Sequence, residues 1–244
     1  MSSDNAKTKE SKRKHVRYAV SDDCRLKASI KLRSADAATA AKDWTGTLVD
    51  MSAEGAHIQI SMGAVAYIND GCVLKLVHGT AKAEMRGTLA HYICSARNSV
   101  CGVKFDFSFG GSEAAYEPFY RTVVASSALK GGPVDTDTPL HYKEEYSGPG
   151  HAKLVLWRNN KPERAVVRFE YVMPRYVAAL TGGGPDMFKN KEHVAFRAVP
   201  KEGAANLPLT PSEEKEARWE FSLAASNLPK SMDPDIRKFL RLVS

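Results

Sequence analysis

Cysteine is scarce in this sequence, and long apolar runs are absent. The four cysteines, Cys24, Cys72, Cys94 and Cys101, form no C-x-x-C pair, which argues against a zinc knuckle or a redox pair of thiols. No stretch approaches the roughly 18 consecutive apolar residues that a membrane-spanning helix needs. The segment 1–14 is polar and lacks the apolar region of a secretory signal peptide. We therefore expect a cytoplasmic protein with reduced thiols and no membrane insertion.

Motifs typical of enzymes are also absent. The seven histidines show no H-E-x-x-H or paired metal-ligand spacing, and no G-x-S-x-G sequence is present. The loop Gly182–Pro185 lacks the Lys-Ser or Lys-Thr that follows the glycines of a phosphate-binding loop. His57 and His91 fall on expected strands, where a solvated or hydrogen-bonded histidine is more common than a catalytic one. These absences predict a protein that is not an enzyme and holds no metal or cofactor.

Positive charge, in contrast, is in excess. The 35 Lys and Arg residues outnumber the 28 Asp and Glu residues, which gives a net charge of +7 and a pI of about 9.2. This balance suits an anionic partner such as a nucleotide, a nucleic acid or an acidic lipid, without choosing among them. The hydrophobic fraction of 43% is enough for a packed core. A length of 244 residues fits one large domain or, as we expect, two.

The stretch D-M-S-A-E-G, from Asp50 to Gly55, organises the N-terminal half. It follows the apolar residues 47–49 and precedes 56–60, where apolar and polar residues alternate, so the pattern predicts strand, tight turn and strand. The turn carries an anionic acceptor at Asp50 and a hydroxyl at Ser52. Gly55 can adopt a positive φ without steric cost and so reverse the chain and admit a ligand. The alternative is a hairpin turn that uses these groups for its own hydrogen bonds.

A second stretch lies upstream, where Arg13 and Arg17 stand four residues apart. Alone, such a pair is commonplace in a basic chain and fits a solvated cationic tail. The order R-x-x-x-R, one strand, then D-x-S-x-x-G resembles the PilZ domain, the bacterial receptor for cyclic di-GMP. The sequence C-G-V-K-F at 101–105 is similar to the G-V-x-F of that family's last barrel strand, and a helix-like stretch follows it. The resemblance covers about residues 12–128.

The resemblance implies a ligand and a set of site residues. In the family, the arginines contact phosphates and guanine, the Asp and Ser hydrogen-bond a base, and the Gly leaves room for the ligand. By position these roles fall to Arg13, Arg17, Asp50, Ser52 and Gly55. The chemistry is suitable, because a guanidinium fork matches phosphate oxygens or the guanine O6/N7 edge. A carboxylate can accept from guanine N1–H and N2–H₂. Both motifs are complete, which favours a binding-competent member over a degenerate one.

Periodicity predicts a small barrel in the N-terminal half. The expected strands span 25–32, 44–50, 56–60, 72–78, 81–93 and 100–107. Gly79 at the first of two loop positions suits a type II′ hairpin. Six antiparallel strands with short turns favour a closed barrel, which removes exposed edges. The stretch Ser112–Leu129 has aromatic residues near helical spacing and predicts a helix over the barrel mouth, with Pro118 at its start or at a kink.

The C-terminal half resembles no family that we recognise. Two apolar runs, 153–157 and 165–173, surround a polar turn and predict a hairpin. Thr210, followed by Pro and then by Glu at the third helical position, predicts the start of a helix. Asp233-Pro234 predicts the start of a last helix, with apolar residues spaced along one face.

We therefore expect a mainly β protein: a six-stranded antiparallel PilZ-like β-barrel with a C-terminal helix, followed by an α+β accessory domain. The predicted segments are a flexible N-terminal arm at 1–11, a cyclic di-GMP-binding domain at 12–128, a linker at 129–150 and an accessory domain of unknown function at 151–244. The K-G-G-P sequence that starts at Lys130 motivates the linker.

The predicted function is a cyclic di-GMP receptor that relays binding, by conformational change, to a protein partner or to its own C-terminal half. The segment with Arg13 and Arg17 is expected to be flexible until the dianion pins it against the barrel. One alternative is a PilZ-like interaction module with an idle ligand site that acts through protein contacts in motility or pilus assembly. Another, with less support, is a nucleic-acid binder, suggested by the basic charge but without a nucleic-acid motif. Nothing in 130–244 supports an enzyme.

Overall fold

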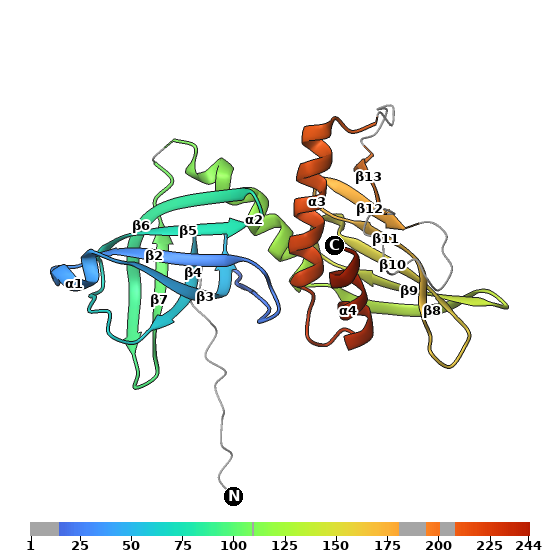
Figure 1. Ribbon diagram of the computed structural model, residues 1–244, viewed down its shortest axis with the longest axis horizontal. Coiled ribbons are helices and arrows are strands. Elements are labelled where there is room, and N and C mark those ends of the chain that lie inside the picture. The colour runs from blue at the N-terminus through green and yellow to red at the C-terminus, as the bar shows by residue number, and fades with distance from the viewer. Residues whose placement is uncertain (1–14, 109, 181–193, 201–207) are drawn as a thin grey trace, which may run out of the picture.

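Two antiparallel β-sheets and the longer helices between them make up most of the described part of the chain (Figure 1). The computed structural model describes residues 15–108, 110–180, 194–200 and 208–244. The arm predicted at 1–11 and the loop Gly182–Pro185 lie outside these residues. The expectation of a mainly β protein is confirmed.

The first sheet closes on itself. Its strands are β2 (Lys27–Arg33), β3 (Asp43–Ser52), β4 (Gly55–Ser61), β5 (Gly71–His78), β6 (Ala81–Cys94) and β7 (Asn98–Phe105). They pair antiparallel in the order β3-β2-β5-β6-β7-β4, and β4 pairs back with β3. A short β1 (Tyr18–Ala19) pairs with the end of β3. The predicted six-stranded closed barrel is therefore confirmed, and a short α1 (Ala37–Ala40) lies within the β2–β3 connection.

Alternation along the strands builds the barrel core. In β2, Ala28, Ile30 and Leu32 are buried while Lys27 and Lys31 face solvent, because successive side chains of a strand point to opposite faces. The β5–β6 hairpin turns at Gly79, whose φ of 59° fits the expected type II′ turn. All four cysteines are free.

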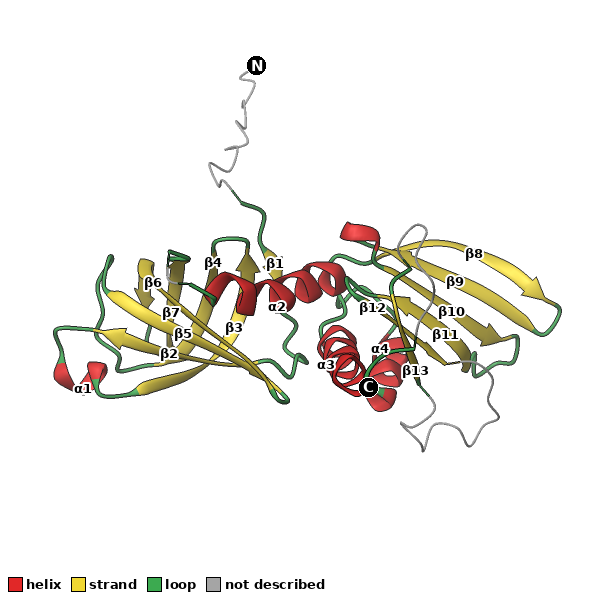
Figure 2. Ribbon diagram, turned by 90° about the horizontal axis from the view of Figure 1, so that it is seen from above, coloured by secondary structure: helices red, strands yellow, loops and turns green. Residues whose placement is uncertain are grey.

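Helix α2 (Ser112–Ser127) covers the barrel and then leaves it. Tyr116, Phe119 and Val123 are buried in the barrel core. Figure 2 shows α2 running from the barrel toward the second sheet, where Ala125 belongs to the second core. The helix begins six residues before Pro118, so Pro118 lies inside it and does not start it.

The second sheet is a meander in sequence order. Its strands are β8 (Lys130–Thr138), β9 (His141–Ser147), β10 (Lys153–Asn159), β11 (Val166–Val172), β12 (Tyr176–Leu180) and β13 (Ala195–Ala198), with a 3-10 turn, η1 (Pro149–His151), between β9 and β10. The hairpin predicted around 158–162 is confirmed as β10–β11.

The linker predicted at 129–150 is wrong in its local structure, because β8 and β9 occupy most of it. β8 is an edge strand whose residues are all exposed, so no burial alternation marks it in the sequence. Pro133 lies where the β8–β9 register shifts between Gly131 and Val134. Edge strands and irregular positions tolerate proline, because no ladder hydrogen bond is lost there.

Two helices pack on the second sheet, as Figure 2 shows. α3 (Pro211–Ser226) begins with the predicted capping box at Thr210, and α4 (Pro234–Val243) begins with Asp233 as its N-cap. α3 also reaches the barrel, since Leu223 belongs to the barrel core and the Trp219 ring lies 5.0 Å from that of Phe119. Within the described residues, no helix combines the length and apolar character needed to span a membrane.

Candidate functional site

The predicted turn is a tight hairpin held by its own hydrogen bonds. β3 and β4 pair with Ser52 opposite Gly55 and Asp50 opposite His57. The buried Ser52 hydroxyl donates to the Gly55 carbonyl at 3.2 Å. The Tyr116 hydroxyl of α2 donates to the Ser52 carbonyl at 2.8 Å. Ser52 therefore serves the turn, as the structural alternative expects.

The role expected for Gly55 needs correction. Its φ does not lie in the left-handed region, so it does not reverse the chain through a positive φ. The reason for glycine is the contact between β4 and β7. A Cβ on Gly55 would lie only 2.3 Å from the carbonyl oxygen of Val103. Glycine at this position lets the two backbones approach each other.

Arg17, Asp50 and His57 form a hydrogen-bonded group on the outer face of the barrel. Arg17 Nη1 lies 3.0 Å from Asp50 Oδ1, and His57 Nδ1 lies 2.8 Å from Asp50 Oδ2. Because a carboxylate only accepts, we assign the imidazole hydrogen to Nδ1. The Arg17 guanidinium lies against this ring, with Nη1 2.6 Å from Nδ1 and 2.5 Å from Nε2. The group joins the segment before β1 to β3 and β4.

This arrangement favours an ionised Asp50. Burial raises the pKa of Asp50, but the hydrogen bond from His57 and the positive charge of Arg17 more than offset burial, so the pKa lies below its ordinary value. Asp50 is therefore an anionic acceptor at neutral pH.

A second histidine lies beside His57. His57 and His91 both pair with Gly102, from β4 and β6 on either side of β7. Gly102 has no side chain, and a Cβ there would collide with the His91 ring. The two imidazole rings therefore approach to 4.5 Å between centroids, edge to face at 72°.

Three of the predicted site residues line a pocket of about 250 Å³. It is lined by His15, Arg17, Ser52, Glu54, Gly55, Ala90, Val103 and Lys104. Asp50 does not line it but is bonded to Arg17 at its edge. His15 Nε2 lies 3.1 Å from Glu54, without the alignment of a hydrogen bond. Arg13 lies outside the described residues, so the structure does not place it. The basic lining can attract an anionic group.

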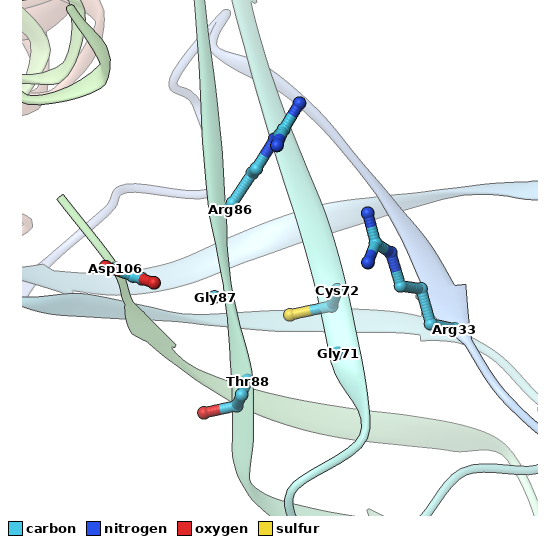
Figure 3. Close-up of a pocket in the computed structure, with 7 residues that line it drawn as sticks. All are labelled: Arg33, Gly71, Cys72, Arg86, Gly87, Thr88 and Asp106. Carbon is cyan, nitrogen blue, oxygen red and sulfur yellow. The ribbon is translucent and has the colours of Figure 1, made fainter. Parts of the chain in front are cut away.

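A second pocket, of about 220 Å³, lies on neighbouring strands (Figure 3). It is lined by Arg33, Gly71, Cys72, Arg86, Gly87, Thr88 and Asp106, none of which was predicted as a site residue. Thr88 pairs across the strands with Lys104 of the first pocket, so the two pockets lie on neighbouring strands. Burial, with Cys101 nearby, raises the pKa of the Cys72 thiol to about 12. The thiol stays protonated and is a poor nucleophile.

The sequence interpretation missed the roles of His57 and Lys104. A signal for His57 was present, because counting outward from a two-residue turn at Ala53 and Glu54 places Asp50 opposite His57. No comparable signal existed for Lys104, which reaches the site because β7 pairs with β4.

Comparison of the sequence with models of known protein families gives no match. Comparison with curated proteins gives no match either. Among the described residues, no group of three or more His, Cys, Asp and Glu side chains is placed to hold a metal ion.

Proposed function

We propose that this protein is a receptor for cyclic di-GMP. The observation that carries the proposal is the contact between its two motif segments. Arg17 of R-x-x-x-R and Asp50 of D-x-S-x-x-G are 33 positions apart, yet their side chains lie 3.0 Å apart. Two motifs joined in this way on the outside of a closed barrel support a single site, which the resemblance to the PilZ domain assigns to this ligand.

Binding would exchange one partner of Arg17 for another. In the described structure the guanidinium contacts Asp50 and His57. A phosphate of the ligand would draw the guanidinium away, because Arg–phosphate pairs are strong and can be bidentate. Asp50 would then be free to accept from guanine. Arg13 is proposed as the second arginine on the strength of its motif position alone.

The route from this site to the C-terminal half is short. Arg17 immediately precedes β1, and the loop Ser21–Arg25 follows β1 and contacts the end of α3. The Ser21 N–H donates to Asn227 Oδ1 at 2.8 Å, and the Arg25 N–H donates to Ser226 Oγ at 3.4 Å. We propose that pinning the arginine segment shifts β1 and is transmitted through this loop.

Ion pairs add to the same junction. Asp22 lies 2.6 Å from Lys230, and Asp23 lies 2.8 Å from Arg241 of α4. Each exposed pair contributes little to stability by itself. Together they mark the loop after β1 as the place where the barrel and the C-terminal helices meet. The proposal includes a protein partner that binds at this junction.

Isothermal calorimetry with cyclic di-GMP tests the function, with GTP and cyclic AMP as control ligands. Arg17→Ala should weaken binding by about 2–4 kcal/mol, the range for truncating one partner of a desolvated charge contact. Arg17→Lys should also bind poorly, because an ammonium keeps the charge but loses the planar fork. Arg218→Ala, an exposed arginine on α3, is the matched control and should bind like the parent. No binding by the parent would refute the proposal.

One observation favours the ligand-independent alternative. Arg17, Asp50 and Ser52 all have partners within the protein, so their presence can be explained by structure alone. In that case the barrel is an interaction module with an idle site. It would fold normally, show no heat with cyclic di-GMP, and lose stability when Arg17 is changed to Ala. Arg17 contacts Asp50 and His57 without ligand in either case, so Arg17→Ala should lower stability under both, and only the calorimetry separates them.

A further inference from the structure

His57 is the residue that neither motif names but that contacts both. It hydrogen-bonds Asp50 through Nδ1 at 2.8 Å, and the Arg17 guanidinium lies against both of its ring nitrogens. The charged and titratable groups that face it are Asp50 from β3, Arg17 from the segment before β1, and His91 from β6. Its side chain is 14% exposed, so it is shielded but open to solvent.

The bonding pattern limits what His57 can do while Arg17 is in place. A neutral imidazole has one N–H and one lone pair. Asp50 takes the N–H, and the Arg17 guanidinium lies against the ring, 2.6 Å from Nδ1 and 2.5 Å from Nε2. If a phosphate draws Arg17 away, the imidazole loses the cation that lies against it, while Nδ1 keeps its carboxylate. An imidazole beside a carboxylate and an incoming anion is favoured in its protonated form.

We propose that His57 is a further ligand-binding residue, which takes up a proton from solvent when Arg17 leaves it and then donates from Nε2 to guanine O6. This inference rests on the proposed function. Asp50 beside His57 would accept from guanine N1–H and N2–H₂, so the pair presents two acceptors next to one donor. Adenine presents the opposite pattern, an amino donor at position 6 and an acceptor at N1. The pair therefore selects guanine over adenine.

Proton uptake makes binding depend on pH. A ligand whose binding takes up a proton binds more tightly as the pH falls, by linkage. The affinity for cyclic di-GMP should therefore rise between about pH 8 and pH 6, the range in which imidazoles ordinarily change charge. Calorimetry at about pH 7 in buffers with different ionisation enthalpies should show net proton uptake.

Substitutions at His57 distinguish what its hydrogen bond contributes to ligand affinity from what its change in charge contributes. His57→Ala should weaken binding about 10- to 100-fold, the range for losing a hydrogen bond with a charged partner. His57→Gln keeps a neutral donor, so it should preserve the preference for cyclic di-GMP over cyclic di-AMP but abolish the pH dependence and the proton uptake. His91→Gln is the control, since it removes the imidazole beside His57, and it should keep the pH profile. Circular dichroism and thermal melting check that each variant folds.

The outcomes distinguish this inference from the function on which it rests. If the parent does not bind cyclic di-GMP at any pH, the proposed function fails and the role of His57 fails with it. If the parent binds but His57→Gln keeps the pH profile, or His91→Gln loses it, the function stands and the assignment to His57 is overturned. Equal affinity of the parent for cyclic di-GMP and cyclic di-AMP would overturn the role in base selection.

Discussion

Asn227 offers a direct test of the junction between the barrel and the C-terminal helices. Its side chain is 1% exposed and makes three hydrogen bonds to segments far away in the sequence. It accepts from the Ser21 N–H at 2.8 Å and donates to Ser126 Oγ at 3.0 Å and to the Val123 carbonyl at 3.4 Å. One amide thus joins the loop after β1, helix α2 and the end of α3.

We expect Asn227→Ala to lower the free energy of unfolding by about 2–4 kcal/mol. The two shorter hydrogen bonds contribute about 1 kcal/mol each, and leaving the Ser21 N–H unpaired costs about 1–3 kcal/mol more. Water reduces that second cost, because Ser21 is partly exposed. Ser126 keeps another partner, since its hydroxyl donates to the Thr122 carbonyl at 2.8 Å. These offsets lower the sum of the two contributions, about 3–5 kcal/mol, to the expected range.

Guanidinium unfolding followed by circular dichroism measures the effect. Asn160→Ala is the matched control, because that side chain makes one hydrogen bond, to the Pro139 carbonyl, at an exposed loop. It should cost less than about 1 kcal/mol. Asn227→Asp keeps the acceptor for Ser21 but buries a carboxylate against the Val123 carbonyl, so it should destabilise the protein at least as much as the alanine variant.

Hydrogen exchange gives a second readout of Asn227→Ala. If the amide holds the loop, the backbone of residues 18–25 should exchange faster in the variant while β10 and β11 stay protected. Equal destabilisation by Asn227→Ala and Asn160→Ala, or unchanged exchange at 18–25, would refute the reasoning. The barrel and the C-terminal helices would then be held together by apolar packing alone.

Two further predictions concern the candidate site. Gly55→Val should lower the free energy of unfolding by about 2–4 kcal/mol through overpacking against the Val103 carbonyl. Gly110→Ala is the control, because a Cβ there meets nothing within 4 Å, and its melting temperature should stay close to that of the parent. Equal loss of melting temperature in the two variants would contradict the close approach of β4 and β7 at Gly55. Because the folded-state pKa of Asp50 is lowered, its stabilising contribution is present above the ordinary value of 3.8 and is lost as the pH falls through the folded-state value. As the pH falls, Asp50→Asn should therefore lose less stability than the parent. Identical dependence of stability on pH in the two proteins would exclude the effect.

Local sequence patterns predicted the secondary structure well where a strand or helix has one buried face. The alternation in β2 and the capping box at Thr210 were readable because the interacting residues are neighbours in sequence. β8 was missed because an exposed edge strand has no apolar period, and its Gly-Gly-Pro sequence looks like a linker. The division of the chain into domains stays a prediction, and α2 and α3 each contribute to both cores.

The sequence by itself determined the hairpin at Asp50–Gly55, since strand period and turn length set which residues face each other across a two-residue turn. It also supplied the two motifs and the ligand chemistry that they imply. Only the tertiary structure decided that Arg17 bonds to Asp50 and His57, that Gly55 is required by Val103, and that the loop after β1 contacts Asn227. Those contacts join residues 33 to 206 positions apart. Their geometry depends on how the barrel closes and how the helices pack, and no local period encodes either.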